Sequence, residues 1–126
     1  MEHVWDPLET VRGAYGLLKP GGAFCMAVHN RKSVSARILG MKSPIFDVEH
    51  LQLFCPATAR LLLERAGFRD VAVSDLWNRY PLYYWMKLLP TPDRIKRPLL
   101  AALKQSFVGR VPLAFPPGNL ICFGFK

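Results

Sequence analysis

The residues best suited to acid–base chemistry are few in this chain and stand far apart. They are the three histidines, each of which adjoins another polar side chain: Glu2-His3, His29-Asn30 and Glu49-His50. A neutral imidazole accepts a proton near neutral pH, so His3 could act as a general base toward an alcohol or an amine, and His50 is a further candidate for an active-site residue. The alternatives are a histidine that packs and satisfies its own hydrogen bonds, and an asparagine that stabilises a turn.

A metal centre is a second kind of site that three histidines could support. Their spacing fits no common ligand pattern, and the cysteines Cys25, Cys55 and Cys122 form no C-x-x-C pair. We therefore expect no metal site and no disulfide framework. The cysteines are interpreted as small core residues of a reduced protein.

A capped helix and a strand should position the first two histidines. Asp6-Pro7 is a typical helix start, and Pro20-Gly21-Gly22 ends the helix with a sharp turn. The run 23–28 is apolar at every position, which predicts a central strand covered on both faces. His29-Asn30 follows at its carboxyl end, where open α/β sheets bind ligands.

The remaining patterns predict further helices and strands, and the alternation of the two favours α/β layers. We expect helices over 33–39 and 56–66, strands over 71–76 and 120–125, and a helical insertion over 77–117 with short helices near 82–89 and 95–106.

Composition and charge narrow the class of protein. An apolar fraction of 51% in 126 residues is typical of a single globular domain. No apolar run approaches about 20 residues, and no leader pattern precedes the first helix, so we expect a cytoplasmic protein. Residues 76–126 carry eight basic residues and one acidic residue. This suggests an anionic partner, unless an acidic segment elsewhere balances the charge.

Two series of motifs resemble the class I S-adenosylmethionine-dependent methyltransferases. The first is Glu2-His3-Val4-x-Asp6-Pro7, followed by a helix and Leu17-Leu18-Lys19-Pro20-Gly21-Gly22 before the apolar strand. The second is His50-Leu51-x-x-Phe54-x-Pro56, followed by a helix and Arg65-Ala66-Gly67-Phe68-x-x-Val71. Together they cover residues 2–75 in the order and spacing of that family.

The resemblance implies a partial Rossmann-like α/β sheet. Residues 23–28, 71–76 and 120–125 would be strands five, six and seven of the family, with the last strand antiparallel between the other two. Residues 77–117 would form a lid over the substrate. The chain has no G-x-G-x-G loop and no acidic strand end after one. We therefore expect residues 1–126 to be a single N-terminally truncated domain that binds cofactor weakly or not at all by itself.

The resemblance also implies roles for individual residues in methyl transfer from S-adenosylmethionine to a small-molecule, lipid or glycan-precursor acceptor. The cofactor residues would be Glu2, His3 and Val4, the catalytic residues His3 and His50, and the acceptor residues His29, Asn30, His50 and Tyr84.

Aromatic residues gather at the start of the basic insertion: Trp77, Tyr80, Tyr83, Tyr84 and Trp85. They could line an acceptor pocket, form a belt that contacts an anionic membrane beside the basic residues, or simply pack on the sheet. The rival functions are therefore a non-enzymatic module that docks on membrane and an inactive remnant. No motif indicates nucleic acid as a partner.

Overall fold

The computed structural model describes residues 1–89 and 91–126. The chain divides into two compact units. Unit 1 comprises residues 1–76 and 117–126, and unit 2 comprises residues 77–116. Within the described residues, no helix is both long and apolar enough to cross a bilayer.

Unit 1 contains a three-stranded antiparallel sheet in the order β1-β5-β2. Its strands are β1 (Ala23–His29), β2 (Arg69–Asp75) and β5 (Asn119–Phe125). The prediction that the last strand lies antiparallel between the other two is confirmed. The strand numbers taken from the methyltransferase family stay a prediction.

Unit 1 also contains three helices and two 3-10 turns, of which α1 precedes β1 and the others lie between β1 and β2. They are α1 (Pro7–Leu17), α2 (Val34–Leu39), η1 (Gly40–Lys42), η2 (Pro44–Phe46) and α3 (Pro56–Ala66). The predicted helix ends are confirmed. The Asp6 carboxylate accepts the Glu9 N–H at 2.9 Å, and Ser33 caps α2. Gly67 ends α3 at a φ of +105°, a backbone conformation that glycine adopts without strain.

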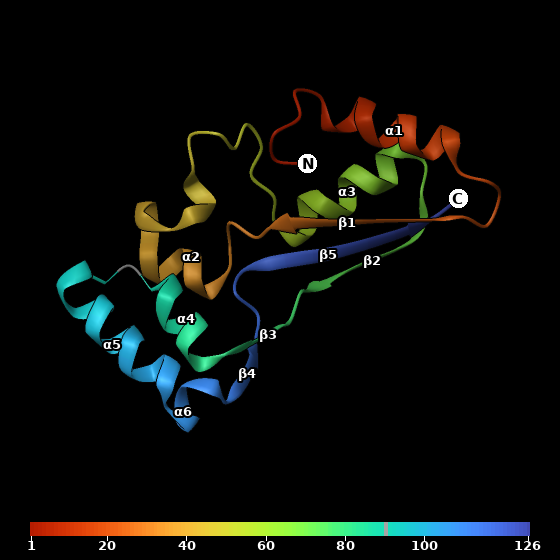
Figure 1. Ribbon diagram of the computed structural model, residues 1–126. Coiled ribbons are helices and arrows are strands. Elements are labelled where there is room, and N and C mark those ends of the chain that lie inside the picture. Colours follow the sequence, from red (N-terminus) through yellow and green to blue (C-terminus); the bar gives the residue numbers. More distant parts are fainter. Residues whose placement is uncertain (90) are drawn as a thin grey trace. The chain divides into compact units, whose positions relative to one another are not determined.

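The core of unit 1 lies between the sheet and the two longer helices. Figure 1 shows α1 and α3 side by side on one face of the sheet. Their inward residues and the inward face of β5 are almost fully buried: Val11, Ala59, Leu63, Leu120 and Cys122. This follows the three- and four-residue spacing of apolar residues in the helices and the alternation in the strand.

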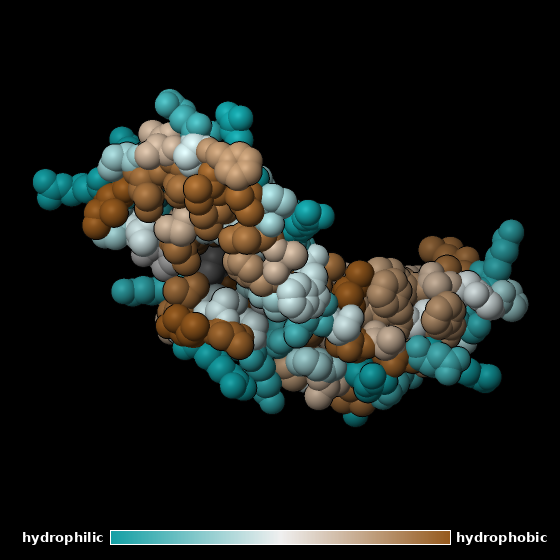
Figure 2. Space-filling model, turned by 90° about the horizontal axis from the view of Figure 1, so that it is seen from below, coloured by the Kyte–Doolittle hydropathy of each residue, from teal (hydrophilic) through white to brown (hydrophobic). Residues whose placement is uncertain are grey.

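The prediction of a strand covered on both faces is wrong for β1. Its side chains alternate between buried and exposed, so Met26 and Val28 lie in the core while Cys25 and Ala27 face outward. Small and apolar residues therefore occupy an open face, and β1 is an edge strand of the sheet. Figure 2, seen from below, shows apolar side chains on the side of the sheet opposite the two helices.

The expectation that all three cysteines are core residues is wrong for Cys25, which is exposed on this open face. Cys55 and Cys122 are buried as expected. Burial, with a smaller contribution from Cys25, raises the pKa of the Cys122 thiol to about 11.

Unit 2 combines a two-stranded antiparallel sheet with three helices that lie between its strands in the sequence. Its elements are β3 (Asn78–Pro81), α4 (Leu82–Leu88), α5 (Asp93–Gln105), α6 (Phe107–Arg110) and β4 (Pro112–Phe115). The two helices predicted near 82–89 and 95–106 are confirmed as α4 and α5. The β3–β4 pairing was not predicted, because each strand has only four residues, and a proline ends β3 and begins β4.

Candidate functional site

The structure brings four of the predicted site residues together at the carboxyl end of β1. The rings of His3 and His50 have centroids 4.9 Å apart, and those of His29 and His50 are 5.0 Å apart. His29 Nδ1 lies 3.0 Å from the Glu2 carboxylate. Residues separated by up to 48 positions in the sequence thus form one cluster. It consists of Glu2, His3, His29 and His50.

Glu2 is the buried anchor of this cluster. Its side chain accepts both the backbone N–H of His29, at 2.5 Å, and the ring of His29. Burial pushes the pKa of Glu2 upward, but the N–H of His29, the N–H of Glu2 itself and the positive charges nearby outweigh it. The pKa of Glu2 therefore lies below its usual value, and the carboxylate is charged at neutral pH.

The hydrogen bonds of the three rings define which nitrogen is free. His3 Nδ1 lies 3.0 Å from the carbonyl oxygen of Glu49, and His50 Nδ1 lies 2.8 Å from that of Ile45. A carbonyl oxygen and an ionised carboxylate only accept hydrogen bonds, so Nδ1 carries the proton in all three rings. In the neutral form of each ring the lone pair is therefore on Nε2, which is the atom that can take a proton from a bound molecule.

Two predicted residues near this cluster have structural roles in the chain. The buried Asn30 accepts the Lys32 N–H at 3.0 Å through its side chain, and its own N–H donates to the Gly118 carbonyl oxygen at 2.7 Å. These bonds match the turn interpretation of Asn30. Val4 is half-buried, and its N–H donates to the carbonyl oxygen of Met1 at 3.4 Å.

Tyr84 belongs to unit 2, so the structure describes it separately from the histidine cluster. Its ring lies 4.6 Å from that of Tyr80, and Trp85 in turn stacks on Phe115 at 4.0 Å. The predicted aromatic group is therefore partly a packing core of unit 2. Trp77 lies outside that core and is largely exposed.

Among residues 1–89 and 91–126, no group of three or more histidine, cysteine or acidic side chains is arranged to hold a metal ion. The Nδ1 atoms of the three histidines are already engaged in hydrogen bonds with protein oxygens.

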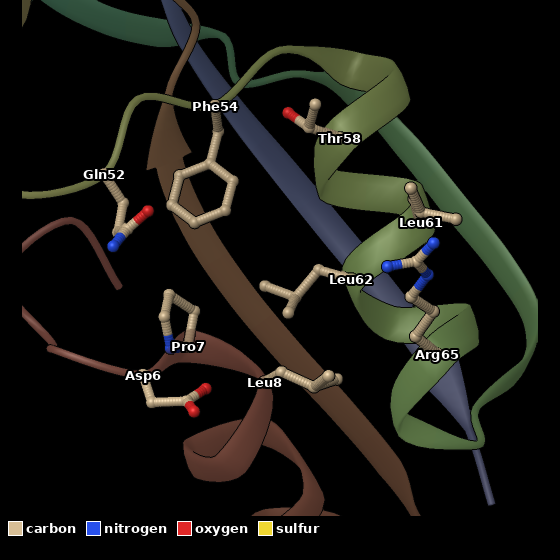
Figure 3. Close-up of a pocket in the computed structure, with 9 residues that line it drawn as sticks. All are labelled: Asp6, Pro7, Leu8, Gln52, Phe54, Thr58, Leu61, Leu62 and Arg65. Carbon is tan, nitrogen blue, oxygen red and sulfur yellow. The ribbon is translucent and has the colours of Figure 1, made fainter.

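A separate hollow of about 240 Å³ lies between the start of α1 and α3, and Figure 3 shows its lining. Leu8, Phe54 and Leu62 line it, with Asp6 and Arg65 also on its wall. Sequence reasoning did not identify it, because its residues are ordinary members of two amphipathic helices and a loop. None of the predicted site residues lines it.

The chain matches no protein-family model and no curated protein sequence. Solved structures do resemble it. A SAM-dependent methyltransferase from Archaeoglobus fulgidus aligns over 99% of this chain and 55% of its own, with 22% identity and a TM-score of 0.55. A SAM-dependent methyltransferase from Thermotoga maritima, described as a possible histamine N-methyltransferase, aligns over 99% and 51%, with 17% identity and a TM-score of 0.55.

The fold of this chain is therefore that of the SAM-dependent methyltransferases. The chain spans about half the length of the two solved structures that it matches. The histidine cluster lies within this shared fold, at the carboxyl end of β1.

Proposed function

We propose that this chain takes part in methyl transfer from S-adenosylmethionine to an alcohol or amine of a small-molecule, lipid or glycan-precursor acceptor. The observation that carries the proposal is the cluster of Glu2 and three imidazoles at the carboxyl end of β1. The fold adds support, since the solved structures that resemble it are named as methyltransferases.

The chemistry assigned to the cluster is removal of the acceptor's proton. Each Nε2 atom can accept a proton from an alcohol or amine within hydrogen-bond reach. His29 has the additional support of Glu2, which holds its Nδ1–H and balances the charge of the imidazolium that forms. His3 and His50 complete the wall of the acceptor site in this proposal, and His3 also borders the cofactor with Glu2 and Val4.

The residues of this chain fit only the edge of the cofactor. The sequence has no G-x-G-x-G loop to receive the cofactor, and the Glu2 carboxylate is already engaged with His29. In the described part of the chain, every buried side-chain nitrogen and oxygen already has a hydrogen-bond partner. None of these buried atoms therefore needs a ligand to satisfy it. We propose that the other contacts to the cofactor come from polypeptide outside this sequence.

Calorimetry and amide NMR with S-adenosylhomocysteine test this proposal on the chain itself. We expect a dissociation constant well above the micromolar range, because the sequence lacks the G-x-G-x-G loop that would hydrogen-bond the cofactor. At millimolar ligand we expect the amide shifts to concentrate at Glu2, His3, Val4 and His29.

The Glu2→Gln variant should lose these shifts, whereas Glu9→Gln removes an equal charge on the exposed face of α1 and should keep them. Micromolar binding would overturn the expectation of a partial site. An absence of shifts at Glu2 and His29 in saturating ligand would overturn the assignment of this cluster to methyl transfer.

A further inference from the structure

Unit 2 is strongly basic and also exposes several large apolar side chains. Residues 77–116 include seven basic residues and a single acidic one, a net charge of +6. Its acid, Asp93, forms an exposed contact of 3.8 Å with Arg97, which contributes little attraction in water. We propose that unit 2 binds the surface of an anionic phospholipid membrane. The proposal is independent of methyl transfer.

The helix α5 carries apolar and basic residues on different faces. Ile95 and Leu99 lie one turn apart on one side and remain 62% and 39% exposed. Arg97 and Lys104 lie on another side, two turns apart, and no residue of α5 is buried. Arg94 and Lys96 lie between these two sides, at the borders of the apolar stripe. A helix whose exposed apolar stripe is flanked by basic residues is suited to lie in the membrane interface.

The basic side of α5 faces a cavity rather than a protein core. The cavity has a volume of about 550 Å³ and its lining includes Lys87, Arg97 and Lys104, with no acidic side chain. Tyr83 and Tyr84 form its aromatic wall, and the ammonium groups of Lys104 and Lys87 lie 6.0 Å from their ring centres. Three positive charges around one cavity fit a phosphate group, which ammonium and guanidinium groups bind through charge-assisted hydrogen bonds.

The apolar residues elsewhere in unit 2 favour a membrane over a soluble phosphate compound. Phe107, at the start of α6, is 86% exposed, and Leu88, at the end of α4, is 51% exposed. A soluble anion would leave these side chains in water, whereas an interface buries them beside its phosphates. A second copy of the chain is disfavoured as the occupant because two units of +6 charge repel each other.

Vesicle sedimentation with the full chain tests the proposal. We expect binding to vesicles that contain phosphatidylglycerol in phosphatidylcholine, no binding to pure phosphatidylcholine, and release in high salt. Free glycerol phosphate should not displace the protein at millimolar concentration. Displacement by that compound would assign the cavity to a soluble phosphate ligand and overturn the membrane proposal.

Charge variants identify the surface. Replacing Arg94, Arg97 and Lys104 with glutamine should weaken vesicle binding on the order of 100-fold, since each basic residue near an anionic surface contributes severalfold. The matched control replaces three exposed basic residues of unit 1 with glutamine: Lys19, Arg37 and Lys42. Equal losses in the two variants would overturn the assignment to unit 2.

Two substitutions of exposed aromatic residues, one in each unit, provide a second and independent test. Phe107→Ser should weaken vesicle binding, and Trp5→Ser, at a residue of unit 1 that is 87% exposed, should not. Circular dichroism of both variants should match that of the parent chain, because each side chain is exposed. No effect of Phe107→Ser, or binding to neutral vesicles as strong as to anionic ones, would contradict the proposal.

Discussion

At the scale of single residues, the Glu2 side chain pairs with the backbone at the end of β1, on the edge that no described strand covers. The backbone N–H of His29 points away from β5, and the Glu2 side chain accepts it where an adjacent strand would offer a carbonyl oxygen. The same carboxylate orients the His29 ring. Glu2 therefore links the stability of the strand end to the geometry of the candidate site.

This role predicts a pH-dependent loss of stability in the Glu2→Gln variant. Because folding lowers the pKa of Glu2, its contribution is complete well above the ordinary carboxyl pKa and is lost as the pH falls through the folded value. Urea unfolding at pH 7 should show the variant less stable than the parent by about 1–3 kcal/mol. At a pH low enough to protonate Glu2, the difference should shrink.

Glu49→Gln is the control for this measurement. The Glu49 side chain is exposed, so its replacement should change the free energy of unfolding by less than about 0.5 kcal/mol. A loss in Glu2→Gln of the same size at both pH values would contradict the link to ionisation.

At the scale of elements, β1 has one paired edge and one open edge. Residues 24, 26 and 28 exchange hydrogen bonds with β5, as the register and the flanking bonds of Gly22 and Asn30 indicate. The N–H groups of Ala23, Cys25 and Ala27 point the other way, and the described residues provide no backbone partner for them. An open strand edge with small exposed side chains favours pairing with another chain.

We therefore expect the chain to self-associate through β1 at high concentration and Ala27→Pro to reduce this association. Proline at position 27 removes an N–H that points away from β5, so the hydrogen bonds between β1 and β5 stay in place. Light scattering after size-exclusion chromatography should show the variant shifted toward monomer, with its helical circular dichroism retained.

Val28→Pro is the matched variant one residue along the strand. This variant removes an N–H that points toward β5 and leaves the buried carbonyl oxygen of Leu120 without its donor. The free energy of unfolding should fall by about 1–3 kcal/mol. Equal stability of the two proline variants would contradict the assigned register.

At the scale of the whole molecule, unit 2 interrupts unit 1 at two points that are neighbours in space. The N–H of Leu76 donates to the carbonyl oxygen of Asn119 at 2.9 Å, and Asp75 pairs with Leu120. The two ends of the interruption thus lie across one antiparallel pair, which a short turn can connect.

We predict that unit 1 folds without unit 2. Replacing residues 77–116 with a short glycine-containing turn should leave a cooperative thermal transition and remove vesicle binding. The core of unit 1 is formed by residues of α1, α3 and the sheet, and all of these remain. Loss of the cooperative transition would show that unit 2 contributes to this core.

The sequence by itself determined the local features: the Asp6 cap, the Pro-Gly-Gly turn, the Gly67 helix end and the order of the helices and strands of unit 1. These depend on residues a few positions apart, whose conformational preferences and periodicity can be read directly. The methyltransferase resemblance added the antiparallel place of the last strand, which the sheet order confirms.

Only the tertiary structure decided which of the separated polar residues share a site. His50 reaches His3 and His29 because the loop after η2 returns to the carboxyl end of β1, and no local pattern encodes that path. It also decided that β1 has an open face. An apolar run shows that its residues can be buried, but only the elements packed around a strand determine whether they are.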